Sequence, residues 1–434
     1  MAKAINFLLS KFKYVLLLYF IIQIIFLFKF PLIYTSDSGY YFKLAQDCIS
    51  HHGFYPLPQH LFEDYIVAPL YVNFIIILLL IFNSSFTIGI FNIVLNAIQI
   101  FLLYKITTII IDEKAARISV ILYILYLNNL GLVMLNLTEL FFTVIVSGGL
   151  YFFLKQKSRS LFIAGIFCGL SIAIRPIGWA LVLSFLTIET YRVYKKEVRF
   201  RGVSYLIAGL FIIVLLFGSI SKLYFGEFIY TSNNGPLNIL MGANDNANGG
   251  FYAKVFDKGQ PGYIEHPENL TYYQKQEFWK NNAGSWITAH PLKWVMLFPK
   301  KLLNMFAWDD VSVSKIVFNN FNLYNFLKAV KEHVPMGIAF AGFSTIEIFI
   351  WGTLQVYHHL FYFFILFFFI FGIIKYRFKV FSNSDFNLLL LFLLIGIMMT
   401  IATIGDPRFK YPYMFIIFIF NSLFISNYFL VKEN

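Results

Sequence analysis

Long apolar stretches alternate with short polar connections along most of the chain. A membrane-spanning helix needs about 20 mostly apolar residues, and about ten stretches come near that length. They are residues 14–34, 86–106, 117–135, 137–154, 161–175, 177–194, 203–222, 351–374, 386–404 and 411–430. The pattern predicts an all-α membrane protein with about ten transmembrane helices.

Lysine and arginine residues predict the orientation of the chain, because they favour the cytoplasmic side of short loops. With the N-terminus inside, most of them fall in inner loops. The short outer loops hold only Lys43, Arg175, Arg408 and Lys410. Residues 66–82 and 336–349 are also apolar, but counting them as spans would reverse this bias. We therefore expect both termini in the cytoplasm, and residues 66–82 at, or dipping into, the outer interface.

This topology divides the chain into three parts. Residues 1–222 form an N-terminal transmembrane module, which includes the first outer loop. Residues 223–350 form a large extracytoplasmic loop, and residues 351–434 contribute the C-terminal transmembrane helices.

The large loop also contains helix signals. Thr271 and Gln274 are spaced as a capping box, which predicts a helix start. Pro291 suits the first turn of a second helix, over residues 292–306. We expect that helix to be amphipathic and interfacial. Its polar positions are Lys293, Lys300 and Lys301.

Composition supports the membrane assignment. Of 434 residues, 59% are hydrophobic and only 13% are charged, whereas soluble domains carry about 25% charged residues. The net charge of +12 comes from residues scattered over short loops, which argues against nucleic-acid binding. Two cysteines, Cys48 and Cys168, exclude a disulfide framework and a cysteine-based metal site.

Several charged residues lie where a membrane makes them costly, and each is a candidate for function. Asp37 stands at the outer mouth of the first span, where capping the next helix is the alternative role. Glu139 lies at the turn of a hairpin over residues 118–154, which reaches about 56 Å and is slightly short for two crossings. We expect that turn to be recessed, with snorkelling of the carboxylate as the alternative.

Cations recur at the same outer ends. Arg175 lies in a still shorter hairpin, and Pro176 forces a break beside it, so we expect Arg175 to face a recessed wet cavity. Arg408 and Lys410 open the last span and depart from the positive-inside trend. Lipid headgroups are the alternative partners of all three, and Asp406 is an alternative partner of Arg408.

Other polar residues rank lower. Asp309 and Asp310 are expected in a solvated turn, and His358 and His359 in packing within a span. The first outer loop also contains His51, His52 and His60, but neither H-E-x-x-H nor D-x-D occurs. We expect no metal or other cofactor.

Outward-facing acids and recessed cations suit group transfer from a lipid phosphate to an acceptor outside the cytoplasm. At these residues the sequence resembles the GT-C integral-membrane glycosyltransferases, which include protein O-mannosyltransferases and lipid A aminoarabinose transferases. The matching stretches are TSDSGYYFKLA around Asp37, VAPLYVNFIIILLLIF (67–82), Thr138-Glu139, GLSIAIRPIGWAL (169–181), WITAHPLKWVMLFPKKLLNMF (286–306) and GDPRFKYPYMF (405–415). Together they cover nearly the whole chain in the order of the family.

The resemblance implies a function for each candidate. The donor would be a polyprenyl-phosphate sugar, and Asp37 would be the base in an inverting displacement. Arg175, Arg408 and Lys410 would bind the donor phosphate, and Glu139 would orient the acceptor or an arginine. The first-loop motif has one acid rather than a D-x-D, which argues against a divalent metal. The acceptor would be a glycan, lipid or protein outside a plasma membrane, such as the bacterial inner membrane.

Three other functions compete with this hypothesis. A transporter or lipid flippase often shows repeated halves, and we find no repeat in the sequence. An oligosaccharide polymerase would share the donor lipid and the large outer loops. A non-catalytic scaffold would not need recessed charges.

Overall fold

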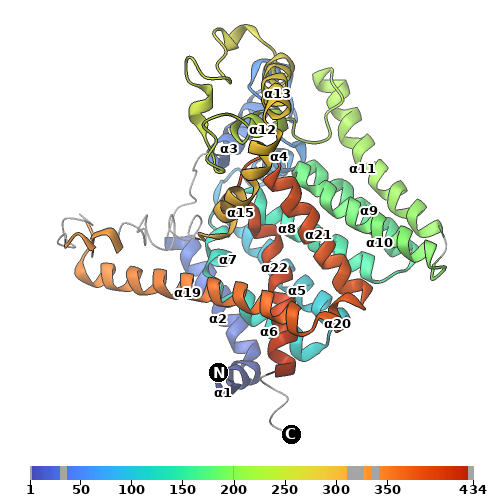
Figure 1. Cartoon of the computed structure of the whole chain (residues 1–434), viewed down its shortest axis with the longest axis vertical. Coiled ribbons are helices and arrows are strands. Elements are labelled where there is room, and N and C mark those ends of the chain that lie inside the picture. Colours follow the sequence, from blue (N-terminus) through green and yellow to red (C-terminus); the bar gives the residue numbers. More distant parts are fainter. Residues whose placement is uncertain are drawn as a thin grey trace.

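The computed structural model describes residues 2–29, 37–198, 200–309, 327–329, 331–333 and 342–428, and these residues form helices and no strand (Figure 1). The helices are α1 (Ala2–Ser10), α2 (Phe12–Lys29), α3 (Asp37–Ser50), α4 (Pro69–Phe82), α5 (Phe86–Ile110), α6 (Glu113–Leu125), α7 (Leu127–Leu132), α8 (Thr138–Leu154), α9 (Ser158–Ile174), α10 (Trp179–Tyr194), α11 (Arg201–Phe225), α12 (Gly235–Met241), α13 (Tyr272–Ala289), α14 (Pro291–Met296), α15 (Phe298–Phe306), α19 (Thr345–Lys375), α20 (Arg377–Phe381), α21 (Ser384–Ile401) and α22 (Tyr411–Tyr428). Short 3-10 turns connect some of them: η1 (Pro58–Phe62), η2 (Pro176–Gly178), η3 (Ala253–Phe256), η4 (Pro267–Asn269) and η5 (Pro407–Lys410).

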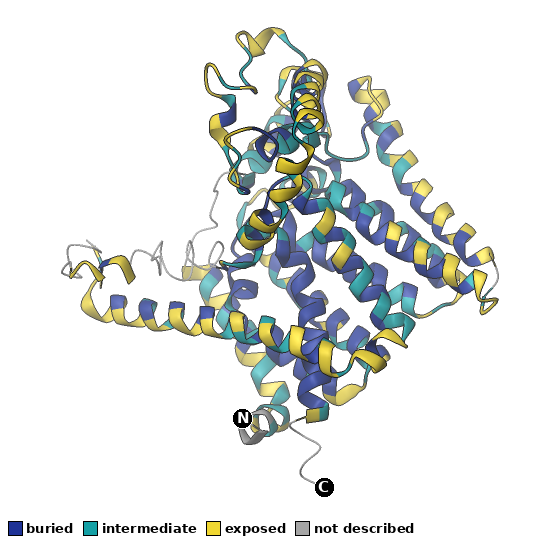
Figure 2. Ribbon diagram, viewed as in Figure 1, coloured by how far each residue is buried: buried dark blue, intermediate teal, exposed yellow. Residues whose placement is uncertain are grey.

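The protein is an all-α membrane protein. Six apolar helical stretches in the described residues are long enough to cross a bilayer: α2, α5, α11, α19, α21 and η5 with α22. Figure 2 shows exposed residues along α19, and many of them are apolar. Phe349, Phe367 and Ile374 expose between 62% and 75% of their surface, as expected for a helix that faces lipid. The count of ten spans stays a prediction.

The core of the bundle surrounds α22, which is buried along most of its length and packs against α6, α8 and α19. In Figure 1, α22 passes through the middle of the bundle, while α12 and α13 gather at one end. On one flank, α9 and α11 touch backbone to backbone. A Cβ atom on Gly165 or Gly209 would stand 2.2 Å from a carbonyl oxygen of the facing helix. Small residues allow such close approach between membrane helices.

The predicted span over residues 117–135 is wrong as a single helix. The helix α6 ends at Leu125, and the short α7 follows. The side-chain amide of Asn129 donates to the carbonyl of Tyr123 at 2.8 Å, so it occupies an acceptor at the end of α6. The turn before α8 is consequently long, and Asn128, Asn129 and Asn136 in it are buried.

The predicted helix over residues 292–306 is also divided. The helices α14 and α15 meet at Leu297, because Pro299 has no N–H to donate to the preceding turn. Lys301, expected on the polar face, is fully buried and lies over the rings of Trp294 and Phe298 at 5.8 and 5.6 Å. The capping box of Thr271 and Pro291 in the first turn are confirmed.

Two apolar segments were kept out of the predicted span count. Residues 66–82 contain α4, a helix of 14 residues, and its place at the outer interface stays a prediction. Within residues 336–349, the last five belong to α19, which begins at Thr345 after a capping box formed by Ser344 and Glu347. Residues 336–341 lie outside the described part of the chain.

Candidate active site

An ion pair joins two segments far apart in the sequence, the start of α3 and the turn before α22. Asp37 is the first residue of α3, and Arg408 lies in the turn η5. Their Oδ2 and Nη2 atoms are 2.8 Å apart. Asp406 caps η5 by accepting the backbone N–H of Arg408 at 2.8 Å, and its Oδ1 lies 3.6 Å from Nε of the same guanidinium. Arg408 therefore stands between two carboxylates.

A second ion pair forms where two helical hairpins turn. Glu139 lies in the first turn of α8, and Arg175 ends α9 in extended backbone, as expected before Pro176. Glu139 Oε1 and Arg175 Nη1 are 3.2 Å apart. The turn is tight, because a Cβ on Gly178 would meet the backbone of α9 at 2.5 Å. The carboxylate of Glu139 is buried, and its Oε2 has no hydrogen-bond partner among the described residues.

The two pairs belong to one cluster. The guanidinium of Arg175 lies 5.5 Å from the ring centre of Phe409, the neighbour of Arg408. The carboxylate of Glu139 interacts electrostatically with Arg408 as well as with Arg175. Side-chain exposure falls from Asp37 at 39% through Arg408 at 22% and Arg175 at 18% to Glu139 at 2%. The cluster is therefore exposed to solvent at Asp37 and buried at Glu139.

Asn136 holds the start of α3 against the turn before α8. Its amide donates to the carbonyl of Ser38 at 3.2 Å, and its Oδ1 accepts the hydroxyl of Tyr71 at 2.8 Å. The Tyr71 ring contacts Tyr41 edge to face at 5.5 Å. Burial raises the pKa of Tyr41, and the nearby Asp37 carboxylate adds to the rise. Tyr41 is therefore a neutral neighbour of the cluster at ordinary pH.

Lys410 lies apart from this cluster, although only two residues separate it from Arg408. Its ammonium is fully buried and pairs with Asp309 Oδ1 at 2.9 Å. It also donates to the carbonyl oxygens of Met305 at 3.2 Å and of Trp308. Three protein partners thus surround the ammonium of Lys410. The sequence resemblance had assigned this lysine to the donor phosphate, together with Arg175 and Arg408.

The sequence reasoning missed Asp309. The expected solvated turn is wrong at this residue, which is fully buried and also pairs with His358 Nε2 at 3.4 Å. Burial alone would raise the pKa of Asp309, but Lys410 and His358 outweigh it and hold that pKa below its usual value. The sequence did contain a signal for this pair. Lys410 stands at the start of an apolar helix, and a buried cation needs an anionic partner. Asp310 lies outside the described residues.

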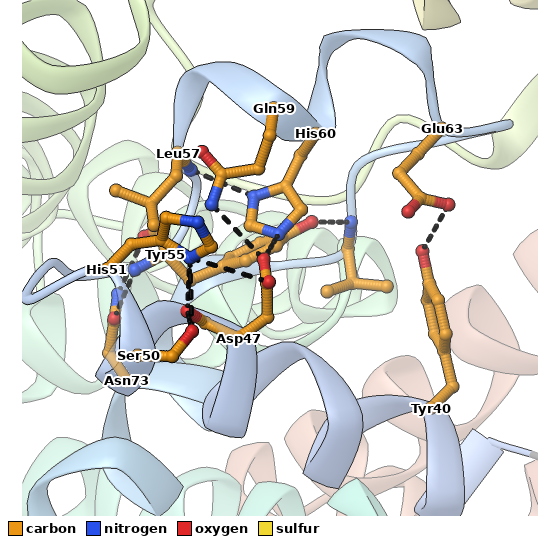
Figure 3. A network of polar contacts seen from close by, with 11 residues as sticks. Tyr40, Asp47, Ser50, His51, Tyr55, Leu57, Gln59, His60, Glu63 and Asn73 are labelled. Carbon is orange, nitrogen blue, oxygen red and sulfur yellow. Dashed lines mark hydrogen bonds and ion pairs between the residues drawn. The ribbon is translucent and has the colours of Figure 1, made fainter.

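A separate polar network lies between α3 and the turn η1 (Figure 3). Asp47 accepts hydrogen bonds from Gln59 at 3.2 Å and from His60 Nε2 at 3.1 Å. The other ring nitrogen of His60 accepts the Leu57 backbone N–H at 2.9 Å, which assigns the proton to Nε2. In the described residues we find no group of three histidine, cysteine or acidic side chains that could hold a metal.

No protein-family profile matches the sequence, and no curated protein does so either. Solved structures of the archaeal oligosaccharyltransferase from Archaeoglobus fulgidus are similar in fold. The apo form matches over 97% of this chain and 51% of its own, at 17% identity and a TM-score of 0.47. The form with Zn and sulfate matches over 96% and 49%, at 17% identity and 0.46. The complex with an inhibitory peptide and a dolichol-phosphate matches over 96% and 50%, at 16% identity and 0.44.

The chain thus spans about half the length of the oligosaccharyltransferase chains that it matches. The TM-scores lie below 0.5, so the function proposed below rests on the geometry of the site.

Proposed function

We propose that this protein is a GT-C-like membrane glycosyltransferase that moves a sugar from a polyprenyl-phosphate donor to a hydroxyl outside the cytoplasm. The observation that carries the proposal is the contact between Asp37, a partly exposed carboxylate, and Arg408 at the mouth of a recessed cluster. A general base and a phosphate-binding cation must stand close together in such a reaction, because both act around one anomeric carbon.

Arg175 and Arg408 bind the donor phosphate. A guanidinium has five N–H donors in a planar fork that suits phosphate oxygens. The contacts with Glu139, Asp37 and Asp406 use only part of these donors. Two positioned cations stabilise the negative charge that develops on the leaving phosphate. Lys410 is left out of this role, because its ammonium already has three protein partners.

Donor binding also prepares the base. Asp37 is paired with Arg408, and a phosphate competes for the same guanidinium. As Arg408 turns to the phosphate, the Asp37 carboxylate is released from this ion pair and can contact the acceptor hydroxyl. Binding of the donor before release of Asp37 is useful to an enzyme, because the base is then available only when a donor is present.

In the transfer step, the acceptor oxygen bonds to the anomeric carbon from the face opposite the phosphate. The bond from that carbon to the phosphate oxygen breaks, and its electron pair leaves with the phosphate. The hydroxyl proton moves to Asp37, and the configuration at the carbon inverts. Glu139 orients the acceptor or Arg175, since its buried Oε2 has an unused hydrogen-bonding capacity among the described residues.

The experiment is sugar transfer in liposomes with a panel of radiolabelled polyprenyl-phosphate sugars and cell-envelope extract as acceptor. We expect Asp37→Asn to lower turnover about 10²–10⁴-fold, as loss of a general base does, with unchanged thermal stability. Glu268→Gln is the matched control, because it removes an exposed carboxylate of the large outer loop and should transfer normally.

Near-normal turnover by Asp37→Asn would remove Asp37 from the role of base. Absence of transfer by well-folded wild-type protein with every donor would contradict the glycosyltransferase proposal. A lipid-scrambling assay would then test the flippase alternative.

A further inference from the structure

A small open cavity lies beside the ion pair of Asp37 and Arg408. Its volume is about 320 Å³, at the lower end of the range of about 300–1,000 Å³ for small-molecule sites. Asp406 and Gly405 form one wall. Asn248 and Phe251 come from the loop after α12, while Asn304 and Trp308 come from α15 and the residues after it.

Close backbone contacts hold the walls together. The N–H of Gly405 donates to the carbonyl of Gly249 at 2.8 Å, and Gly249 has a φ of +92°, a conformation that suits glycine. A Cβ on Gly405 would stand 1.9 Å from the carbonyl oxygen of Lys301 in α15. The loop after α12, the helix α15 and the segment before η5 are therefore joined at this point, and these backbone contacts define the shape of the cavity.

The lining has the chemistry of a sugar-binding site. Phe251 and Trp308 expose 64% and 49% of their surface, and aromatic faces pack against the C–H face of a sugar ring. The Trp308 ring is held edge to face against His359 at 6.2 Å. The amides of Asn248 and Asn304 supply donors and acceptors for hydroxyl groups. Asp406 adds a carboxylate, which accepts hydrogen bonds from hydroxyl groups and repels an anionic ligand.

Asp406 links the cavity to the reaction centre. Asp406 lines the cavity, its Oδ1 accepts the backbone N–H of Arg408 at 2.8 Å, and the Arg408 guanidinium contacts Asp37. A sugar seated in the cavity would therefore have its anomeric phosphate beside Arg408. An acceptor would instead have to approach from the exposed side of Asp37.

We propose that this cavity binds the glycosyl group of the donor and that it favours a neutral hexose over a uronic acid. The proposal rests on the proposed function, because it needs a donor whose phosphate is held at Arg408. Trp308 and Asn304 bind the sugar ring and its hydroxyl groups, and Asp406 disfavours a uronic acid and couples the bound sugar to the arginine.

The first test is binding, which requires no transfer. Purified full-length protein is titrated with mannose, glucose and galactose 1-phosphate, glucuronic acid 1-phosphate, and inorganic phosphate, with tryptophan fluorescence as the signal. We expect saturable quenching by at least one hexose 1-phosphate and none by the uronic acid or by inorganic phosphate. Trp308→Phe should abolish the quenching, while Trp286→Phe, a control on α13, should retain it.

The second test measures transfer with Trp308→Leu, Trp308→Phe and Asn304→Ala. We expect the donor KM to rise about tenfold in Trp308→Leu and Asn304→Ala, to stay near normal in Trp308→Phe, and the kcat at saturating donor to change little. A tenfold change corresponds to about 1.4 kcal/mol of lost binding. The KM for the acceptor should not change.

The two tests separate the two proposals. Transfer with an unchanged donor KM in both Trp308→Leu and Asn304→Ala would overturn the cavity assignment and leave the glycosyltransferase proposal intact. A rise in the acceptor KM alone would also overturn it. Quenching of Trp308 by a hexose 1-phosphate, without transfer from any lipid donor, would support the cavity assignment and contradict the proposed reaction.

Discussion

At the scale of single residues, neighbours in sequence have different environments. Arg408 keeps 22% of its side chain exposed and contacts Asp37, whereas Lys410 is fully buried with Asp309. Both residues lie in the 3-10 turn η5, which directs their side chains to different partners. Burying one partner of an ion pair without the other is costly, so we expect Lys410 to stabilise the fold and Arg408 to bind substrate.

Replacement of Lys410 should test this division. Lys410→Met leaves the Asp309 carboxylate buried without its lysine partner, and breaking a buried pair costs about 3–5 kcal/mol. We expect a clear fall in the midpoint of thermal unfolding, measured in detergent by fluorescence. Asp309→Asn together with Lys410→Met should recover most of the loss, because no buried charge is left unpaired.

The comparison variant is Arg408→Lys, which keeps a cation at a partly exposed position. We expect it to unfold near the wild-type temperature while losing donor binding, since a lysine lacks the planar fork of donors. If Lys410→Met were as stable as wild type, the buried pair with Asp309 would not stabilise the fold.

At the scale of elements, polar side chains hold short segments near the candidate site in place. The network of Asp47, Gln59 and His60 ties the turn η1 back onto α3, the helix that begins at Asp37 (Figure 3). In the large loop, burial lowers the pKa of Lys301 in α15 to about 8. This buried lysine lies under the cavity, where its backbone contacts Gly405. Both examples show polar side chains used to pack short elements.

The His60 network should depend on pH. Burial lowers the pKa of His60, against an opposing effect of Asp47 and Glu63. The folded loop therefore prefers the neutral ring, and the unfolded loop takes up a proton first, near pH 6.5. We expect stability of residues 51–65 to be lost as the pH falls below about 6.5. Hydrogen exchange of these amides at pH 7.5 and 5.5 measures the effect.

Two variants complete this measurement. His60→Gln should remove the pH dependence between those two values, because no titrating ring is left at that position. His51→Gln alters an exposed side chain and should behave as wild type. Equal protection of wild-type residues 51–65 at both pH values would show that burial of His60 is not linked to folding of the loop.

At the scale of the whole molecule, the bundle has two different ends. The candidate site lies where α22 begins, whereas α1 and the far end of α22 lie at the opposite end (Figure 1). The predicted charge bias places that opposite end in the cytoplasm. Together these observations predict that the site opens on the outer side of the membrane.

Cysteine labelling in intact cells tests the orientation. The native cysteines, Cys48 and Cys168, are buried, so we expect the maleimide to label only the introduced cysteine. A membrane-impermeant maleimide should label Glu268→Cys in intact cells, and should label Lys157→Cys only after permeabilisation. The reverse pattern would place residues 66–82 across the bilayer and the candidate site on the inner side.

The sequence by itself determined the class of the fold and four members of the candidate cluster. Apolar length predicts membrane helices whatever their partners are, because the bilayer imposes the same minimum on every span. Asp37, Glu139, Arg175 and Arg408 were identified for a similar reason, since charge at such positions is costly wherever it occurs. The start of α13 followed from a local capping box at Thr271.

Only the tertiary structure decided which charges meet. Asp37 and Arg408 are separated by 371 positions, and no local pattern indicates that they form a pair. The burial of Asp309, the end of α6 at Leu125 and the cavity beside Asp406 likewise depend on side chains from distant segments. Local rules act over one or two turns of a helix, whereas ion pairs, burial and cavities depend on how the helices pack.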